Sequence, residues 1–286
     1  MSARTRYLTI IISCLVIVFV FISFFMNSNQ KAAERPKISD GEYAKAWVQC
    51  QNLMSSHNYY HGVNHNLEEL AAIWVSEDGE FAKTATFSQP QGVMEGLQMI
   101  KVTYGNNKTK NPNQSLKEMI KNEPSEYPVG TWGIHMNTTP VIEVAGDGKT
   151  AKGIWFSPGI MMNYTGQKDK DGNDLAGGMV FFEKYAADFV KEKGVWKIWH
   201  IQMFYDYVPS IGDDWTKPNA KKQQAQAMPA GDKKEQKDQG AASPEQAQDN
   251  RKKNPIQYEQ WSPTRVSSIT PKIPEPYYTF SETFSY

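Results

Sequence analysis

Four stretches of the sequence have the composition of β-strands, and turn signals separate each one from the next. They are rich in β-branched and aromatic residues and cover residues 131–144, 150–162, 176–192 and 195–207. Glycine-containing turns or loops lie between them at Gly146–Gly148, Gly166–Asp174 and Lys193–Gly194. Because short connections join antiparallel neighbours, this order predicts a meander of antiparallel strands.

The sequence ahead of these strands has helical periodicity. A first helix is expected over residues 41–60, with Asp40 as its N-cap, and two shorter helices over residues 67–74 and 92–104. The apolar stripe of the first helix is expected to consist of Trp47, Cys50, Leu53 and Met54. Helices followed by strands predict an α+β domain, in which three N-terminal helices cover one face of the sheet.

An unbroken apolar run, residues 7–26, lies near the N-terminus. Twenty helical residues span about 30 Å, the thickness of the bilayer hydrocarbon. The run ends in Phe24-Phe25-Met26-Asn27, which is a poor cleavage site. We therefore expect a retained transmembrane helix within a membrane anchor over residues 1–30. A cleaved signal peptide and a lipoprotein attached through Cys14 are the weaker alternatives.

The side of the membrane on which the domain lies is nearly undecided by charge. Arg4 and Arg6 flank one end of the run, and Lys31, Arg35 and Lys37 flank the other. We expect the soluble domain on the non-cytoplasmic side, because translocation of a large domain behind a short N-terminal tail is the commoner outcome.

The remaining sequence divides by composition. Residues 31–40 form a charged spacer, and residues 41–214 contain the expected helices and strands. Residues 215–255 hold almost no large apolar side chain, so we predict a disordered linker there. Residues 256–286 are again rich in aromatic residues and proline, which predicts a tail that packs on the domain or on a partner.

Charge and cysteine content exclude some classes of protein. Lys+Arg and Asp+Glu number 31 each, so the composition gives no reason to expect a nucleic-acid partner. The two cysteines are Cys14, in the apolar run, and Cys50, in the soluble part, so no internal disulfide holds the domain together. Aromatic residues make up 12% of the chain, which favours a packed core and an aromatic-lined cavity.

Particular motifs on these elements are similar to those of a known family. The motifs are Cys50–Met54 with Tyr59–His61, Thr139–Gly148, Ala151–Gly159 and Val195–His200. Over residues 41–214 the chain resembles the SnoaL-like branch of the nuclear transport factor 2-like superfamily, with the scytalone dehydratase-like proteins as the nearest type.

The resemblance implies a cone-shaped, curved antiparallel sheet packed on the three helices, with an apolar pocket at its open end. Enzymes of this type use no cofactor. They remove a proton next to a carbonyl with a histidine, often paired with a carboxylate, beside tyrosine hydroxyls. The superfamily also includes ligand carriers and catalytically silent domains, so the fold alone does not decide the function.

The resemblance also implies which residues are catalytic here. His135 matches the strand histidine that serves as general base, and Tyr60 matches a pocket tyrosine. His61 falls where the dehydratase has an aspartate, and the strand at residues 154–158 has no histidine, so the scytalone reaction itself is not expected. The alternative for His135 is a non-catalytic role, as a structural histidine held by hydrogen bonds. The predicted substrate-binding residues are Tyr59, Trp155, Glu183, Tyr185 and His200.

Two patterns suggest metal ligands but are better explained otherwise. His57, His61 and His65 are spaced four residues apart, yet Gly62 is expected to end the helix before the third. The acidic stretch 169–174 lacks the bidentate glutamate of a calcium loop and is expected to be an exposed hairpin loop. No metal site is predicted.

The sequence thus predicts a membrane-tethered SnoaL-like domain that binds a small apolar molecule, with lyase, isomerase or cyclase activity through His135, Tyr60 and His61. The alternative is a non-catalytic ligand-binding or protein-assembly domain, and a homo-oligomer is left open. No cofactor and no nucleic-acid partner are expected.

Overall fold

Helices precede most of the strands along the chain, as the periodicity predicts. The computed structural model describes residues 36–105, 111–122, 129–215 and 251–283. The helices are α2 (Asp40–Gly62), α3 (Asn66–Ile73), α4 (Leu97–Thr103) and α5 (Leu116–Asn122). The strands are β1 (Thr86–Gln89), β2 (Gly92–Glu95), β3 (Trp132–His135), β4 (Thr138–Val144), β5 (Thr150–Lys168), β6 (Asp174–Glu192) and β7 (Val195–Tyr207), and a 3-10 helix, η1, spans Phe280–Glu282.

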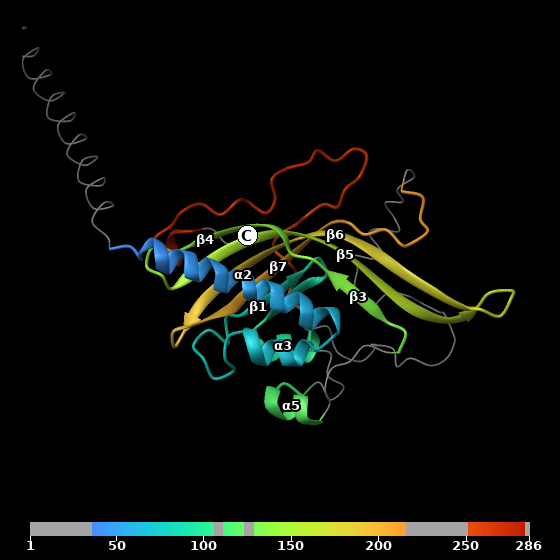
Figure 1. Cartoon of the computed structure of the whole chain (residues 1–286), viewed down its shortest axis with the longest axis horizontal. Helices are drawn as coiled ribbons and strands as arrows, with labels where there is room; N and C mark the ends of the chain where they lie inside the picture. The colour runs from blue at the N-terminus through green and yellow to red at the C-terminus, as the bar shows by residue number, and fades with distance from the viewer. Residues whose placement is uncertain (1–35, 106–110, 123–128, 216–250, 284–286) are drawn as a thin grey trace, which may run out of the picture. The chain divides into compact units, whose positions relative to one another are not determined.

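The strands form one sheet in the order β2-β1-β7-β6-β5-β3, with β4 also paired to β5. The antiparallel meander predicted for the second half of the chain is confirmed, since β5 pairs with β6 and β6 with β7 in antiparallel register. The sheet curves against the helices, which confirms the predicted α+β class (Figure 1). β1 adds to the far side of β7 in parallel, an addition that the sequence did not predict.

Two element boundaries differ from the predictions. Residues 92–95 form strand β2 instead of the start of a helix, because β1 and β2 make an antiparallel hairpin that ends with the turn into α4. The expected strand over residues 131–144 is broken into β3 and β4. The break is at residues 136–137, and a second irregularity lies inside β4: Thr139 has φ +48° and is followed by Pro140, which has no N–H to donate, and the pairing with β5 shifts register between Thr138 and Val141.

The two faces of the sheet are covered by different parts of the chain. Along β6 the odd-numbered side chains face α2 and α3, and we call this the inner face. The even-numbered ones face the C-terminal segment 251–283, and we call this the outer face. On the inner face the Trp155 indole donates to Gln51 of α2 at 2.8 Å. On the outer face Lys184 donates to the Thr270 carbonyl at 3.0 Å. Figure 1 shows α3 and α5 on one side of the sheet and the red C-terminal segment on the other.

Strand β7 contains two bulges that alter this alternation. The pairing with β6 skips Trp199, between Ile198 and His200, and skips Asp206, between Tyr205 and Tyr207. A bulge opposes two residues to one. Trp199 and His200 accordingly both contact Phe280 of the C-terminal segment, and Asp206 and Tyr207 both reach toward it as well.

Helix α2 begins one residue earlier than expected. Ser39, not Asp40, is the N-cap: its hydroxyl accepts from the Glu42 backbone N–H while the Glu42 carboxylate accepts from the Ser39 N–H. This capping box satisfies two backbone donors at the helix start. The buried stripe of α2 is Ala46, Cys50, Met54 and His57, so a histidine takes part in the core, whereas Trp47 and Leu53 are only half-buried.

Several predicted segments fall outside the described residues. These are the membrane anchor over residues 1–30, half of the spacer and most of the linker, residues 216–250. No helix in the described part of the chain is long and apolar enough to cross a membrane. Residues 252 and 254 contact the β1–β2 hairpin: Lys252 forms a bridge with Val93, and the Asn254 amide donates to the Gln89 carbonyl.

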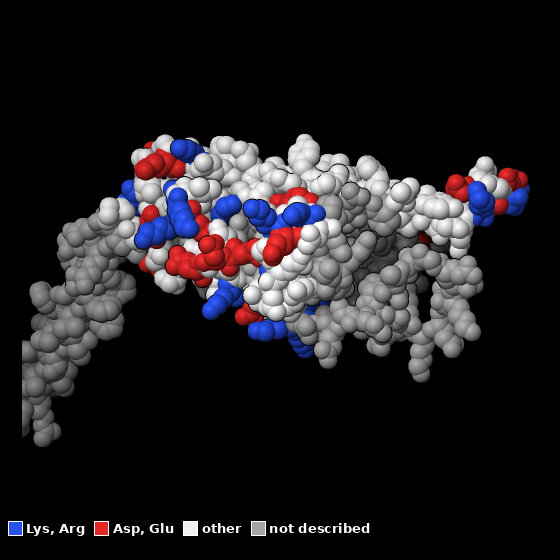
Figure 2. Space-filling view, turned by 90° about the horizontal axis from the view of Figure 1, so that it is seen from below, with Lys and Arg blue, Asp and Glu red and all other residues white. Residues whose placement is uncertain are grey.

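Acidic and basic side chains are interspersed on the face shown in Figure 2, and both kinds occur at the far tip of the β5–β6 hairpin. At that tip the Asp169 carboxylate accepts from the backbone N–H groups of Asp171 and Asn173. The acidic stretch 169–174 therefore closes an exposed hairpin, as expected. The mixture of signs on the visible face fits the balanced charge of the sequence.

Candidate active site

A histidine and a carboxylate from two different strands meet on the inner face. His135, the last residue of β3, lies with its Nδ1 2.8 Å from Oε1 of Glu183 on β6. The Glu183 side chain is fully buried and that of His135 is nearly so. With the carboxylate as acceptor, Nδ1 carries the proton and Nε2 keeps its lone pair. No described residue forms a hydrogen bond with that Nε2, so the imidazole has the tautomer of a general base.

His135 borders a hollow of about 400 Å³ between the end of α2 and strand β3. The wall is apolar along Val63, Trp132, Ile134 and Met136. Asn58 and Asn137 border it as well, and the side-chain oxygen of each is buried without a hydrogen-bond partner among the described residues. Donation from Asn137 Nδ2 to the Met54 carbonyl at 2.9 Å fixes which end of that amide is the oxygen. The border of the hollow thus contains two acceptor oxygens that no described residue uses.

His61 packs beside His135, with 5.3 Å between the two ring centroids. Tyr104 donates its hydroxyl hydrogen to Glu69 at 2.6 Å, so the contact of 3.1 Å between that hydroxyl and His61 Nδ1 must have the histidine as donor. Burial, and then the nearby imidazoles of His57 and His135, lower the pKa of His61 to about 3. His61 is therefore a neutral ring with its proton on Nδ1.

A second buried carboxylate, Glu69 of α3, holds the rest of this cluster in place. Its Oε1 contacts His57 Nδ1 at 2.9 Å and accepts from the Trp74 indole at 2.8 Å, while Oε2 accepts from Tyr104. The His57 and His61 rings stack at 5.5 Å between centroids. Two helices, α2 and α3, are thereby joined by polar contacts inside an otherwise apolar core.

Several polar atoms near Glu183 lack a partner. Among the described residues nothing bonds to Glu183 Oε2, Ser157 Oγ, the Tyr185 hydroxyl or His57 Nε2, and all four are buried. Ser157 lies directly across from Glu183 in the β5–β6 register. Burial, with the charge of Glu183 second, raises the pKa of Tyr185 well above its usual value, so its hydroxyl keeps its proton. An unbonded buried polar atom is costly, which marks this region as more than packing.

The structure brings some of the predicted site residues together and separates others. His135, His61, Glu183 and Tyr185 share the inner face. Tyr60 is half-buried at the end of α2, and its hydroxyl makes no hydrogen bond within the described residues. Tyr59 borders the hollow but is 83% exposed.

Trp155 and His200 have other surroundings. The buried Trp155 ring packs against Phe189 and bonds to Gln51, so it links the sheet to α2. His200 lies on the outer face, where its Nδ1 is 2.8 Å from Asp188 Oδ2 and its Nε2 is 3.1 Å from the Thr84 carbonyl. Both residues are thus placed away from the His135 hollow by the packing of the sheet.

Sequence reasoning did not identify the partners that organise the site. Glu183 was expected to line a pocket, and the structure shows it bonded to His135. Glu69 and the role of His57 were not foreseen. A helical stripe that ends in His57 instead of an apolar residue was a usable signal, because a core histidine needs a buried partner.

No group of three or more His, Cys, Asp or Glu side chains in the described residues is arranged to hold a metal ion. His57 and His61 are close, but their Nδ1 atoms are used by Glu69 and by Tyr104 and Asn66. His65 lies beyond α2, with its Nδ1 4.0 Å from Glu68.

Residues 42–202, more than half of the 286-residue chain, match the model of the SnoaL-like domain family. The chain belongs to this family. The match confirms the resemblance expected from the sequence and spans the helices and the sheet that build the site. No curated protein matches the sequence.

Some solved structures are distantly similar. A hexachlorocyclohexane dehydrochlorinase from Novosphingobium barchaimii is 17% identical with a TM-score of 0.41, over 63% of this chain and 100% of that chain. A nuclear transport factor 2-like superfamily protein from Salmonella enterica is 11% identical with a TM-score of 0.38, over 60% of this chain and 99% of that chain. These values are too low to transfer a substrate or a reaction.

Proposed function

We propose that this SnoaL-like domain binds a small, largely apolar molecule in the His135 hollow and removes a proton from one of its carbon atoms, without a cofactor. The observation that carries the proposal is the His135–Glu183 pair. The buried Glu183 carboxylate fixes Nδ1 of His135, and Nε2 of His135 has no partner in the described structure. The reaction is then a lyase, isomerase or cyclase step. The N-terminal apolar run would tether the domain to a membrane, with the domain on the non-cytoplasmic side.

Each polar group at the site has a separate task in this reaction. His135 Nε2 takes the proton, and Glu183 orients the ring and stabilises the imidazolium that forms. Asn58 and Asn137 accept hydrogen bonds from a hydroxyl or N–H of the substrate and so select molecules that carry one. His61, kept neutral by its low pKa, places no competing positive charge beside His135.

A generic carbon acid can test the base without knowledge of the substrate. In nitrobenzisoxazole, removal of the ring C–H proton breaks the N–O bond and gives a coloured nitrophenolate with a nitrile, so no other reactant is needed. We expect turnover by the full-length chain, and His135→Gln should lower kcat/KM by on the order of 10²–10⁴-fold at a temperature where circular dichroism shows that the variant is folded. His65→Gln, at a half-exposed histidine nearby, is the matched control. Equal rates for the two variants would contradict the proposal.

The natural ligand can be sought in parallel. Native mass spectrometry of the purified full-length chain should show a small molecule of low polarity that is retained by the wild type. Its incubation with active protein should change its mass or its retention time. A ligand that is held but never altered would favour the alternative, a non-catalytic binding domain.

A further inference from the structure

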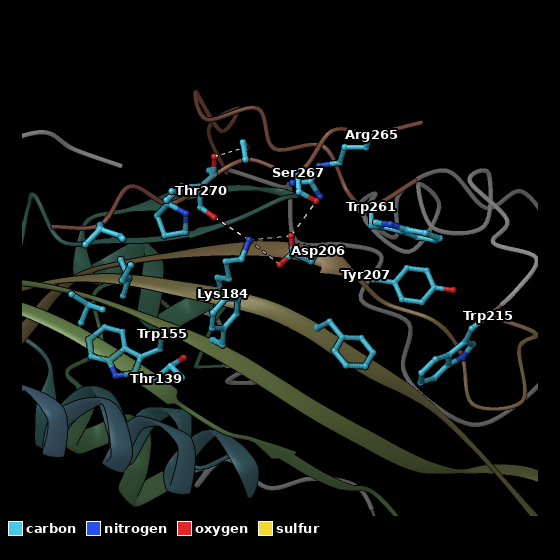
Figure 3. Close-up of a pocket in the computed structure, with 18 residues that line it drawn as sticks. Thr139, Trp155, Lys184, Asp206, Tyr207, Trp215, Trp261, Arg265, Ser267 and Thr270 are labelled. Atoms are coloured by element: carbon cyan, nitrogen blue, oxygen red, sulfur yellow. Dashed lines mark hydrogen bonds and ion pairs between the residues drawn. The ribbon is translucent and has the colours of Figure 1, made fainter. Parts of the chain in front are cut away.

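A second and larger cavity lies on the opposite side of the sheet. It has a volume of about 840 Å³ and lies between the outer face of β4–β7 and the C-terminal segment (Figure 3). We call it the outer chamber. None of the residues that border it borders the His135 hollow. Its size is within the range of sites for small organic molecules.

The walls of the outer chamber are mainly apolar. One end is built of four aromatic rings that contact one another, Phe182, Tyr207, Trp215 and Trp261, with 5.4 Å between the centroids of Tyr207 and Trp261. At the other end Val141 and Ile154 of the sheet lie opposite Ile269 and Ile273 of the C-terminal segment. Figure 3 shows Tyr207, Trp215 and Trp261 grouped to one side of Lys184 and Asp206, and Trp155 on the other side.

A small charged group interrupts this apolar lining. Lys184 Nζ is 3.0 Å from Asp206 Oδ2, and Arg265 Nη1 is 3.5 Å from Asp206 Oδ1. Two cations therefore share one carboxylate, and the group has a net charge of +1. The bulge in β7 places Asp206 and Tyr207 together on this face, so the charge and the aromatic wall come from neighbouring residues.

Arg265 is the cation with unused hydrogen-bonding capacity. Lys184 already donates to Asp206, to the Tyr258 hydroxyl and to the Thr270 carbonyl. A guanidinium has five N–H donors, and within the described residues Arg265 makes two hydrogen bonds, one to Asp206 and one to the Tyr258 hydroxyl. Its side chain borders the outer chamber and is 10% exposed, and its remaining donors have no acceptor among the described residues. Carboxylates are the natural acceptors for such a fork.

We propose that the outer chamber is a binding site for an amphipathic organic acid, with an apolar body against the aromatic and aliphatic walls and its carboxylate on Arg265. The net positive charge favours an anion over an amine, and the apolar lining excludes a small inorganic ion as the main ligand. This site is independent of the proposed catalysis, because the sheet separates the two cavities.

A fluorescent fatty acid, dansylamino-undecanoate, can serve as the probe on the full-length chain. We expect saturable binding with quenching of tryptophan fluorescence, since Trp215 and Trp261 border the chamber. Dodecanoate should displace the probe at least tenfold more effectively than dodecylamine of the same length. A lack of saturable binding, or a preference for the amine, would overturn the proposal.

Two pairs of variants locate the bound probe. Arg265→Gln should weaken binding at least tenfold, and Lys272→Gln, in the same segment but outside the chamber lining, should leave it within twofold. Val141→Trp fills the chamber from the sheet side and should abolish binding even if the C-terminal segment tolerates no change. Val195→Trp, at an exposed strand valine elsewhere, is its control. Unchanged binding in Arg265→Gln or in Val141→Trp would show that the probe binds elsewhere.

Discussion

The sheet carries two histidine–carboxylate pairs with the same short distance and different surroundings. On the inner face His135 Nδ1 lies 2.8 Å from Glu183, and on the outer face His200 Nδ1 lies 2.8 Å from Asp188. His200 uses its second nitrogen on the Thr84 carbonyl, and Asp188 also binds Lys152 at 2.7 Å. His135 and Glu183 have no such third partners in the described residues. A histidine–carboxylate pair is thus a candidate for catalysis only where the second ring nitrogen and the second carboxylate oxygen make no further hydrogen bonds.

The comparison also explains what each pair contributes. Both ring nitrogens of His200 face acceptors, so neither offers a lone pair to a substrate. The outer pair is a structural network that fastens β5, β6 and β7 to the loop before β1. Within the part of the chain that the structure describes, the inner pair leaves Nε2 of His135 and Oε2 of Glu183 unbonded, and the buried Oε2 is a cost in stability that a site for chemistry can carry.

The largest expected effect separates the two carboxylates by activity. Glu183→Gln removes the charge that orients His135, and turnover of nitrobenzisoxazole should fall by on the order of 10²–10⁴-fold. Asp188→Asn should change it less than twofold under conditions where the variant is folded. Similar losses in both variants would mean that the inner pair has no special role.

The free energy of unfolding should depend more strongly on the outer pair than on the inner pair. Asp188→Asn removes the carboxylate that contacts the buried Lys152 ammonium at 2.7 Å, and the free energy of unfolding should fall by about 3–5 kcal/mol in urea titrations. Asp174→Asn is the control, because the exposed Lys168–Asp174 pair should be worth less than about 1 kcal/mol. A small loss at Asp188 would show that the outer network is dispensable.

The pH dependence of stability tests the neutral ring beside the inner pair. Unfolded His61 takes up a proton below a pKa of about 6.5, whereas the folded state does so only near 3. The unfolded state therefore binds more protons in this window, and stability should fall by about 1.4 kcal/mol for each pH unit between 6.5 and 3 as acid is added. His61→Leu should lose this component, measured as the difference between wild type and variant at pH 7 and pH 5. Parallel curves would contradict a buried neutral His61.

The smallest effect concerns a hydroxyl on each face. Ser157 Oγ on the inner face has no partner among the described residues, so Ser157→Ala should change the free energy of unfolding by less than about 1 kcal/mol or raise it. Thr150 Oγ1 lies 3.2 Å from the Tyr277 hydroxyl, and Thr150→Val should cost about 0.5–1.5 kcal/mol. Equal costs would indicate that Ser157 is bonded in solution.

The sequence predicted the helices before the meander and the family, because those depend on local periodicity and motifs. His135 was also found from its strand and the resemblance. The partner of His135 could not be found from the sequence, because a meander fixes which strands are neighbours but not which face a residue occupies. Alternation along β6 places Glu183 and Asp188 on opposite faces, but only the packing of the helices and of the C-terminal segment decides which face is the inner one.

The C-terminal part was the least predictable. Aromatic composition indicated that residues 256–286 pack on something, but contacts such as that between Lys184 and Thr270 join residues far apart in the chain. The element boundaries at residues 92–95 and 136–137 were missed because strand pairing, and not local propensity, decides the structure there. Residues 92–95 pair with the neighbouring strand β1 in a hairpin, and β3 pairs with the more distant strand β5.

The two bulges in β7 have a consequence for how this strand tolerates substitution. In a saturation mutagenesis scan, an ordinary strand gives sensitive and tolerant positions that alternate. Along Val195–Tyr207 the side chains of one face are at even positions before Trp199 and at odd positions between Trp199 and Asp206. The pattern of sensitive and tolerant positions should therefore shift by one residue at Trp199 and shift back at Asp206. An insertion or deletion of one residue between these two points would exchange the side chains of the two faces over the intervening segment. Length variation should therefore be tolerated less there than at the tip of the β5–β6 hairpin.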